Sequence, residues 1–573
     1  MAFSPTSFRV DIDTSPMLLT AAVLVLIASI RSQLTQSAFA SLLSCVVNAI
    51  LVRLYRIQHI DNGDFLPSLP YVFPNGQGSV EKFLQGRANS ALWEIKYGGL
   101  YRLWAGMRGE VVLTKAAHVE AVFRDSHAHT KAHASGMGYL MDCLLGSCLG
   151  LISGSSWNTL KTKVEAPFLH PAVSIYAADL QNFTEKYLHE LETNTSKPSQ
   201  EGCLHPVQDL KVLPFLFVAR LLYGPLDAEL QKELVEMIPL REKLFKSVIA
   251  GGITRFNLAR LLPFPLPAMR TLKSFKDRWA KWNDKAHLHA TQLAPDQQHH
   301  QKAPPIVEMY KSAEEGAIPR EQLLQTLDEM LFANIDVTMG GVSWTLVFLA
   351  AYPSVQKALR EEIRAHSPPS SGSSARDTYL LSSWTSKPTL LGACILEASR
   401  LRPLAAFSVP QSCPTDRVLD GYRVPAGTDF VVDAYALNIR DPFWGTDREK
   451  FRPRRWLERH HQSSSGGGGA RDLRYRYWRF GFGPRTCLGK YVVELVTRSI
   501  VVNLLEGWEL SLDFKTTGQQ SEKPRTDGGA VEVDEEDMDW PWDDEMWIHH
   551  PDVLLRRKPL KGQSQVHEFA TNC

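Results

Sequence analysis

The chain has few cysteines for its length and almost no net charge. Eight cysteines stand among 573 residues, at positions 45, 143, 148, 203, 394, 413, 487 and 573, without the short regular spacing of a disulfide framework or a zinc site. We therefore expect reduced thiols in a reducing compartment. The formal net charge is +1, so the composition gives no argument for nucleic acid as a partner.

The sequence also lacks an apolar run of about 20 residues near its N-terminus, the length that crosses a bilayer as a helix. Two shorter apolar stretches, 17–30 and 38–52, stand there, and neither ends in a convincing small-residue cleavage site. Arginines follow both stretches, which by the positive-inside rule keeps the rest of the chain in the cytosol. We expect residues 1–56 to form a membrane anchor, with one stretch spanning and the other lying in the interface. The alternative is a pair of buried core helices.

Residues 480–489 read Phe-Gly-Phe-Gly-Pro-Arg-Thr-Cys-Leu-Gly and combine turn-forming residues with one cysteine. Gly481 and Gly483 permit backbone conformations that a side chain would forbid. Cys487 stands just before a helical pattern, and a helix N-terminus favours thiolate over thiol. The alternative is a tight turn around a buried cysteine, the usual state of a lone thiol. The complete pattern F-x-x-G-x-R-x-C-x-G favours a thiolate that suits iron.

This decapeptide resembles the haem-binding loop of cytochromes P450, a family that ligates haem through a cysteine thiolate. The resemblance implies haem b as cofactor and Cys487 as the axial ligand of its iron. It also implies that Phe480 packs beside the sulfur and that Arg485 binds a propionate, while Gly483 and Gly489 complete the loop.

Trp157 and Lys161 stand four residues apart and therefore share one face of a helix. Cytochromes P450 commonly carry Trp-x-x-x-Arg at this point, with both side chains on a haem propionate. Lys161 keeps the positive charge but loses the planar fork of arginine. The alternative is a solvated lysine beside a half-buried tryptophan.

A long helix is expected from 320 to 351, ending before Pro353. Asp336 stands in its apolar centre, where a carboxylate needs a partner or a task. In the P450 pattern an acid and the following Thr help to deliver protons during oxygen cleavage. Here Val337 replaces that Thr, and Thr338 lies about 100° further round the helix. We predict Asp336 and Thr338 as catalytic residues; a buried salt bridge of Asp336 is the alternative.

Glu397 and Arg400 stand three residues apart and can pair on one helix face. The P450 resemblance assigns them to the E-x-x-R motif, which joins a later arginine to lock the fold near the haem. Arg455, in Phe-Arg-Pro-Arg-Arg-Trp, matches that arginine. The predicted role of these three residues is structural.

Two segments look like loop insertions, a Ser/Gly tract at 463–469 and an acidic, tryptophan-containing stretch at 518–545. The histidine pairs at 299–300, 460–461 and 549–550 stand in polar segments and are predicted to be solvated. Basic residues gather near the cysteine loop, where they would attract an acidic redox partner if they face solvent. They are Arg454, Arg455, Arg459, Arg474, Arg476, Arg479 and Lys490.

Together these features predict a mainly α fold with small β-sheets, the cytochrome P450 fold, behind an N-terminal membrane anchor. The catalytic domain is expected over 57–573, on the cytosolic side of the endoplasmic reticulum membrane. The resemblance implies a fungal monooxygenase that oxidises an apolar small molecule, an intermediate of secondary metabolism, with electrons from NADPH–P450 reductase. Two alternatives stay open: a P450-fold enzyme of oxidative coupling or rearrangement, motivated by Val337, and a non-enzymatic membrane haem protein.

Overall fold

The computed structural model describes nine parts of the chain. They are residues 33–193, 202–262, 266–293, 303–366, 379–381, 388–464, 473–513, 540–542 and 547–560. The first apolar stretch, 17–30, and most of the two predicted insertions lie outside these residues. The second apolar stretch forms most of helix α2 (Gln33–Leu54).

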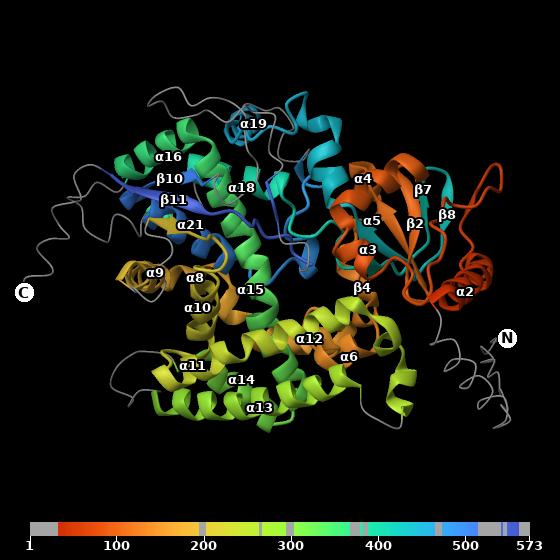
Figure 1. Cartoon of the computed structure of the whole chain (residues 1–573), viewed down its shortest axis with the longest axis horizontal. Helices are drawn as coiled ribbons and strands as arrows, with labels where there is room; N and C mark the ends of the chain where they lie inside the picture. The colour runs from red at the N-terminus through yellow and green to blue at the C-terminus, as the bar shows by residue number, and fades with distance from the viewer. Residues whose placement is uncertain are drawn as a thin grey trace, which may run out of the picture.

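The described residues form a strand-rich region and a larger helical region (Figure 1). The strand-rich region, at the right of Figure 1, contains most of the small sheets together with four helices. These helices are α2, α3 (Val80–Phe83), α4 (Gly86–Tyr97) and α5 (Ala116–Phe123).

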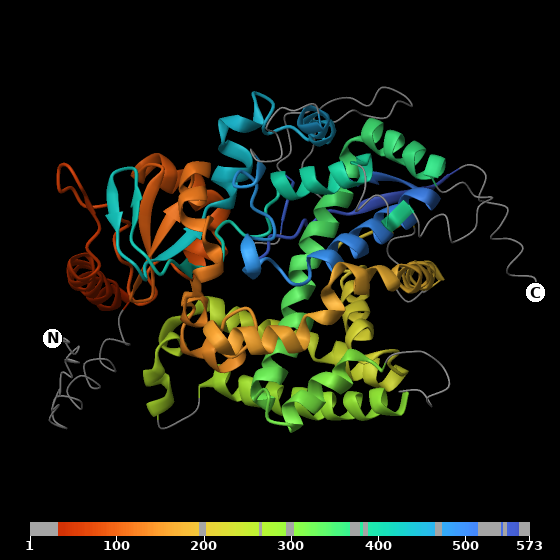
Figure 2. The ribbon, with the colours of Figure 1, turned by 180° about the vertical axis from the view of Figure 1, so that it is seen from behind.

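The helical region holds the largest buried apolar cluster, and the view from behind shows its helices arranged around α15 (Figure 2). Its first helices are α6 (Tyr139–Leu145), α7 (Gly154–Val164), α8 (His170–Ile175), α9 (Ala177–Thr193), α10 (Val212–Tyr223), α11 (Ala228–Glu236) and α12 (Ile238–Ala250). The later ones are α13 (Pro267–Leu293), α14 (Pro305–Glu314), α15 (Arg320–Ala351), α16 (Pro353–His366), α18 (Leu390–Leu401), α19 (Arg454–Ser464) and α21 (Lys490–Gly507).

Three small sheets complete the described fold. The five-stranded sheet has the order β2 (Leu100–Ala105), β3 (Arg108–Leu113), β9 (Asp429–Val432), β6 (Gln411–Ser412), β4 (Thr130–Lys131). The first three-stranded sheet has the order β1 (Gln58–His59), β8 (Tyr422–Val424), β7 (Arg417–Leu419). The second has the order β10 (Trp508–Leu512), β11 (Leu555–Pro559), β5 (Cys203–Leu204).

The strand pairing joins distant parts of the chain. The hairpin of β2 and β3 is antiparallel, with Leu100 opposite Leu113, while β3 pairs in parallel with β9, Glu110 opposite Asp429. Segments more than 300 residues apart in the sequence therefore share one sheet, so the strand-rich region forms only when both ends of the domain are present.

Helix α15 crosses the middle of the molecule and has the bounds that the sequence predicts. Pro319 precedes its first residue, and Pro353 follows shortly after its last residue. Proline lacks the backbone N–H that a helix interior needs, so the helix ends before Pro353. By length and composition α15 could cross a membrane, but 82% of its most apolar window is buried inside the protein. It is therefore the central helix of the core.

The described end of the acidic stretch packs into the core, so the prediction of a solvated loop at 518–545 is wrong at Trp540. Its side chain is buried between Trp344 and Phe348 of α15, with ring centroids at 6.3 and 5.3 Å. The solvated-loop prediction for the pair at 549–550 is also wrong. His550 is buried, and the indole of Trp344 donates to the backbone carbonyl of His549 at 2.8 Å.

We predict that Trp540→Ala lowers the free energy of unfolding by about 3–5 kcal/mol, because a buried aromatic side chain leaves a cavity. Urea unfolding of the haem-loaded protein, followed by circular dichroism, measures the change. Phe65→Ala is the matched control, since Phe65 is half-exposed and should change stability by less than about 1 kcal/mol. Equal effects of the two substitutions would contradict the docking of Trp540.

Candidate haem and substrate site

The cysteine loop closes on itself just before helix α21. The backbone N–H of Cys487 donates to the carbonyl of Phe480 at 2.8 Å, and that of Thr486 donates to Gly483 at 3.0 Å. Gly481 and Gly483 have φ values of +77° and +67°, a region that other residues rarely adopt. The fold therefore places Cys487 three residues ahead of the first residue of α21.

Cys487 has open surface although it lies deep in the protein. Burial raises the pKa of its thiol, with a smaller lowering by the backbone N–H of Gly489, yet the side chain is exposed. A soft thiol with open surface at the start of a helix fits a haem iron, which would supply the charge that holds the sulfur as thiolate.

Arg485 and Trp157 lie together, as the sequence predicts for neighbours of a common ligand. The guanidinium carbon of Arg485 is 4.1 Å from the ring centroid of Trp157, and its Nη1 donates to the carbonyl of Ile152 at 2.8 Å. The ammonium of Lys161 lies 5.0 Å from the same ring and pairs with Glu165 at 3.4 Å. Lys161 thus contacts the tryptophan but already has a carboxylate partner.

Two further charged residues near this site were missed in the sequence. Burial lowers the pKa of Lys131 to about 8, with a further lowering by Arg485, and burial lowers the pKa of Arg485 to about 10. Glu329 of α15 accepts from the backbone N–H of Gly150 at 3.0 Å and is the acid that partly offsets both shifts. Two desolvated cations beside one acid fit the two propionates of a haem. The sequence did not indicate Lys131 as a site residue, because it belongs to none of the motifs around the cysteine.

Glu494 on α21 joins this helix to the residues just before the cysteine loop. It lies between the guanidinium groups of Arg479 and Arg498 and pairs with both. Burial alone would raise the pKa of Glu494, but the two arginines outweigh it and lower the pKa to about 2. Arg479 also lies over the ring of Phe480, 4.5 Å from its centroid, which ties this ion cluster to the start of the loop.

The structure brings Glu397, Arg400 and Arg455 together in the fully buried core. Arg400 pairs with both oxygens of Glu397 at 2.9 Å, and Arg455 Nε reaches Oε1 at 2.7 Å. The indole N–H of Trp456 donates to Glu397 as well, at 2.9 Å. Arg400 also donates to the carbonyl of Asn438 at 2.9 Å.

The predicted basic patch is smaller than its seven residues suggest. Arg455 is buried on Glu397, and Arg479 is partly buried and pairs with Glu494. Arg459 lies over the ring of Phe443, 4.0 Å from its centroid. Arg454 and Arg474 are exposed and remain available for a partner. The sequence could not separate inward from outward arginines because their partners are distant in the chain.

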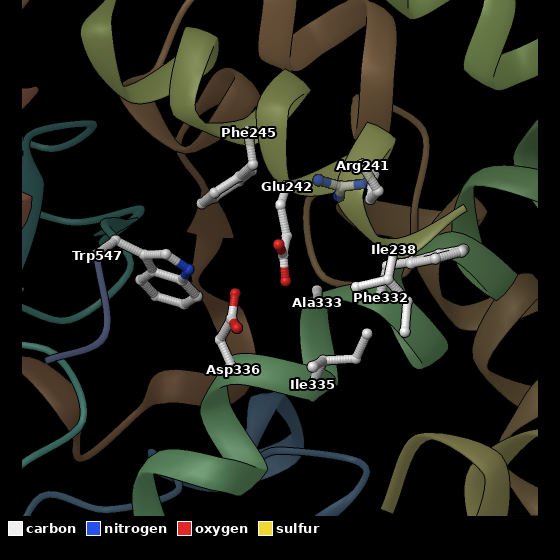
Figure 3. Close-up of a pocket in the computed structure, with 9 residues that line it drawn as sticks. All are labelled: Ile238, Arg241, Glu242, Phe245, Phe332, Ala333, Ile335, Asp336 and Trp547. Atoms are coloured by element: carbon white, nitrogen blue, oxygen red, sulfur yellow. The ribbon is translucent and has the colours of Figure 1, made fainter. Parts of the chain in front are cut away.

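Asp336 lines a small pocket, partly open to solvent, between α12, α15 and the segment around Trp547 (Figure 3). Its carboxylate points across the cavity toward Glu242, with Trp547 beside them (Figure 3). Lys211 Nζ pairs with Glu242 and lies 3.9 Å from Asp336 Oδ1. Burial raises the pKa of Asp336, Lys211 lowers it and Glu242 raises it.

The rest of the cavity wall is mainly apolar. It is lined by Ile238, Arg241, Phe245, Phe332, Ala333 and Ile335. The imidazole of His550 donates from Nε2 to the backbone carbonyl of Asp336 at 2.8 Å, which fixes α15 beside the cavity. Thr338 is buried, and Val337 is partly exposed.

Sequence reasoning missed the residues opposite α15. Arg241, Glu242 and Phe245 come from a helical segment that shows no motif, and Trp547 comes after the predicted acidic insertion. The amphipathic pattern of α12 indicates which face is buried but not which element it meets.

Comparisons with known proteins agree with this geometry. The family model Cytochrome P450 matches residues 80–532. The chain is 45% identical over 503 residues to cytochrome P450 monooxygenase aclC of Aspergillus oryzae, covering 88% of this chain and 93% of that protein. It is 36% identical over 474 residues to cytochrome P450 monooxygenase gliC of Aspergillus fumigatus, covering 82% and 88%.

A solved structure, a zebra fish cytochrome P450 with progesterone, superposes with a TM-score of 0.59 at 17% identity, covering 83% of this chain and 99% of that one. At this identity the likeness concerns the fold alone. The chain belongs to the cytochrome P450 family. It is an oxidoreductase of the fungal monooxygenase type, a class that carries a haem-thiolate iron.

We predict that acid weakens the fold through Glu494. Because its pKa in the folded protein lies below the ordinary value of 4.5, ionised Glu494 stabilises the fold above about pH 4.5, and this contribution is lost as the pH falls toward 2. Glu494→Gln should therefore be about 3 kcal/mol less stable than wild type at pH 7. The gap should narrow below pH 4.5 in urea unfolding measured from pH 7 to pH 3. A gap that does not depend on pH, or an equal effect of Glu509→Gln on an exposed strand position, would contradict this role.

Proposed function

We propose that this protein is a haem-thiolate monooxygenase that oxidises a mainly apolar small molecule, an intermediate of fungal secondary metabolism. The observation that carries the proposal is the pairing of two features within one fold: the Cys487 loop at the start of α21, and Asp336 on α15 lining a mainly apolar pocket. The fungal monooxygenases among its relatives support it.

Residues around the loop would hold the haem. Cys487 is the proposed ligand of the iron, and Phe480 and Gly489 shape the loop around the sulfur. Arg485, Trp157 and Lys131 are the proposed propionate neighbours. When bound, the haem supplies the oxidising chemistry of the reaction. Glu397, Arg400 and Arg455 hold the surrounding backbone in place.

Asp336 is the proposed proton donor within the cavity. Burial raises its pKa, so its carboxyl binds a proton more readily than an exposed aspartate. Lys211 contacts both Glu242 and Asp336, and about a quarter of its side chain is exposed. This cluster gives protons a route from solvent to Asp336 that does not need the hydroxyl missing at Val337.

We propose that electrons come from NADPH through NADPH–P450 reductase and that the protein works at the endoplasmic reticulum membrane. One face of α2 packs on the strand-rich region through Leu51, next to Trp104. The opposite face has an exposed apolar stripe at helical spacing, consisting of Phe39, Leu42, Val46, Ile50 and Leu54. A helix docked along one side suits the interface, so we assign that place to 38–52.

A second candidate is oxidative coupling or rearrangement. It is favoured by Val337 at the position of the usual relay residue. A product that carries one new oxygen atom from dioxygen would exclude coupling, and loss of product without NADPH would exclude a redox-neutral rearrangement.

We predict that the reduced carbon-monoxide complex of the wild type has a red-shifted Soret band and that Cys487→Ala abolishes it. Cys45→Ala is the matched control, since Cys45 is an exposed thiol on α2 and should leave the band unchanged. Circular dichroism confirms that both variants fold. A folded Cys487→Ala protein with the wild-type band would overturn the ligand assignment.

We predict that Asp336→Asn lowers NADPH-driven product formation about 100-fold while the carbon-monoxide band persists, because the amide cannot donate a carboxyl proton. The assay uses the first substrate that a screen by Soret shift identifies. Thr338→Val, a near-isosteric change at a buried position, shows whether that hydroxyl takes part in the relay. Full activity of Asp336→Asn would remove Asp336 from the mechanism.

A further inference from the structure

Arg255 lies buried in a recess that three glycines leave open. It ends the short helix η4 (Gly252–Arg255), which follows α12 in the connection to α13. A side chain on Gly78 or Gly106 would come within 3.2 or 2.9 Å of its guanidinium nitrogens. A side chain on Gly138 would collide with its Cγ and its backbone. The strand-rich region and the segment after β4 therefore leave a space that the side chain of this arginine fills.

The guanidinium of Arg255 bonds to uncharged groups. Its Nη1 donates to the hydroxyl of Ser79, and its Nη2 donates to the backbone carbonyl of Gly136. The acid whose charge acts on Arg255 most strongly, Glu110, already pairs with Lys82 at 2.6 Å. Burial lowers the pKa of Arg255, which reflects the cost of taking this cation out of water. A buried cation on neutral acceptors regains its hydration when it leaves, so this contact suits a reversible tie.

The segment that Arg255 grips has a strained backbone. Ala134 and Ser135 have φ values of +49° and +53°, which residues with a side chain seldom adopt. Both are buried, and the amide N–H groups of Ser135 and Met137 donate to nearby backbone carbonyls at 3.1 and 2.8 Å. Strain of this kind persists only where surrounding contacts hold it. The bond from Arg255 to the carbonyl of Gly136 is one such contact.

The two segments that meet at Arg255 adjoin two walls of the proposed site. Ala134 stands three residues after Lys131, a proposed propionate neighbour. On the other side, η4 follows α12, whose residues Arg241 and Phe245 line the pocket with Asp336. Helix α6, which follows the strained segment, contacts η4 as well. A movement of one segment away from the other would therefore change the opening of the site.

We propose that Arg255 is a latch between these two walls and that its release opens the site to bulky molecules. When the guanidinium lies in the recess, the connection from α12 to α13 is closed on the segment 133–138. When it leaves, the strain at Ala134 and Ser135 relaxes, which makes opening easier. The latch controls how fast a molecule enters and leaves rather than how tightly it binds. The proposal rests on the proposed function, because the site that it closes is the haem and substrate site.

Two haem ligands of different size test the latch in the haem-loaded protein: clotrimazole, a bulky azole, and carbon monoxide. Association and dissociation rates are followed at the Soret band, by stopped-flow mixing for clotrimazole and by flash photolysis for carbon monoxide. We expect Arg255→Met to raise both clotrimazole rates about tenfold and to change its dissociation constant less than about threefold, because the closed state alone loses two hydrogen bonds. The carbon-monoxide rates should stay unchanged, since a diatomic gas needs no wide opening.

Arg260→Met is the matched control for this substitution. Arg260 stands on the same connection and is exposed, so its removal should leave the rates of both ligands unchanged. Arg255→Met leaves no buried acid alone, because Glu110 keeps its pair with Lys82.

A second variant, Gly106→Ala, blocks the recess without changing Arg255. Its new methyl group would lie 2.9 Å from Nε of Arg255, so the clotrimazole rates should rise as they do in Arg255→Met. Gly63→Ala is its control, since Gly63 has a similar positive φ, +73° against +60°, with open space around it. Backbone strain alone would act in both alanine variants, whereas a blocked recess acts in one. If Arg255→Met failed to hold haem, Gly106→Ala would decide the test.

Hydrogen exchange gives a readout that does not need haem. The amides of Ser135 and Met137 should exchange about tenfold faster in Arg255→Met than in wild type, because the strained segment opens more often. Unchanged clotrimazole rates in Arg255→Met and Gly106→Ala would overturn the latch and leave the monooxygenase assignment intact. A change in the dissociation rate alone would also overturn it, since that result indicates a direct contact with the ligand. A purified wild type without the carbon-monoxide band would overturn the monooxygenase assignment, and the exchange rates would still decide on the latch.

Discussion

A single buried carboxylate, Glu397, holds the parts of the fold around the proposed haem site. It receives bonds from Arg400 on its own helix and from Arg455, Trp456 and the backbone of Arg452 some 55 residues later. Two buried guanidinium groups around one carboxylate are stable only while every member is present, because removing one partner of a buried pair costs about 3–5 kcal/mol.

The cluster extends from Glu397 to the cysteine loop through backbone groups. Arg400 donates to the carbonyl of Asn438, and the side chain of Asn438 makes two bonds with the backbone of Trp478, each of 2.8 Å. Trp478 stands two residues before the loop, and Glu494 continues the tie on its other side through Arg479. The position of Cys487 therefore depends on a connected set of polar contacts rather than on the loop alone.

Helix α15 relates the two halves of the site. Three acids on successive parts of α15, Asp328, Glu329 and Asp336, each contact a different part of the protein. Asp328 holds Arg241, Glu329 faces the cations near the loop, and Asp336 faces the cavity. A rigid, buried helix is the element that can keep these three acids at fixed spacing. Burial raises the pKa of each, and for Asp328 to about 6, so charge on this helix depends on its partners.

Features with local causes could be predicted from the sequence. The bounds of α15 follow from prolines at both ends, and the β2–β3 hairpin follows from glycines between two apolar strands. The cysteine loop carries its turn residues within ten positions. The contact between Glu397 and Arg400 is a matter of helical spacing, although the place of Arg455 came from resemblance.

Features with distant causes could not be predicted. Trp540 and His550 follow an acidic, polar stretch, yet both are buried against α15, about 200 residues earlier in the chain. Arg241 stands in a helix whose pattern shows only an apolar face. Whether an arginine there is solvated, fully paired or partly paired depends on Asp328, 87 residues away.

The contrast between Arg220 and Arg241 shows how distant partners decide the geometry of a buried arginine. Both are arginines of the helical region beside an aspartate, and their sequences give no reason to treat them differently. Arg220 satisfies both oxygens of Asp179 with two nitrogens, which is the better arrangement for stability alone. Arg241 makes the poorer arrangement where the wall meets the cavity. The geometry of a buried arginine pair thus depends on how its two helices pack, which the sequence of either helix does not show.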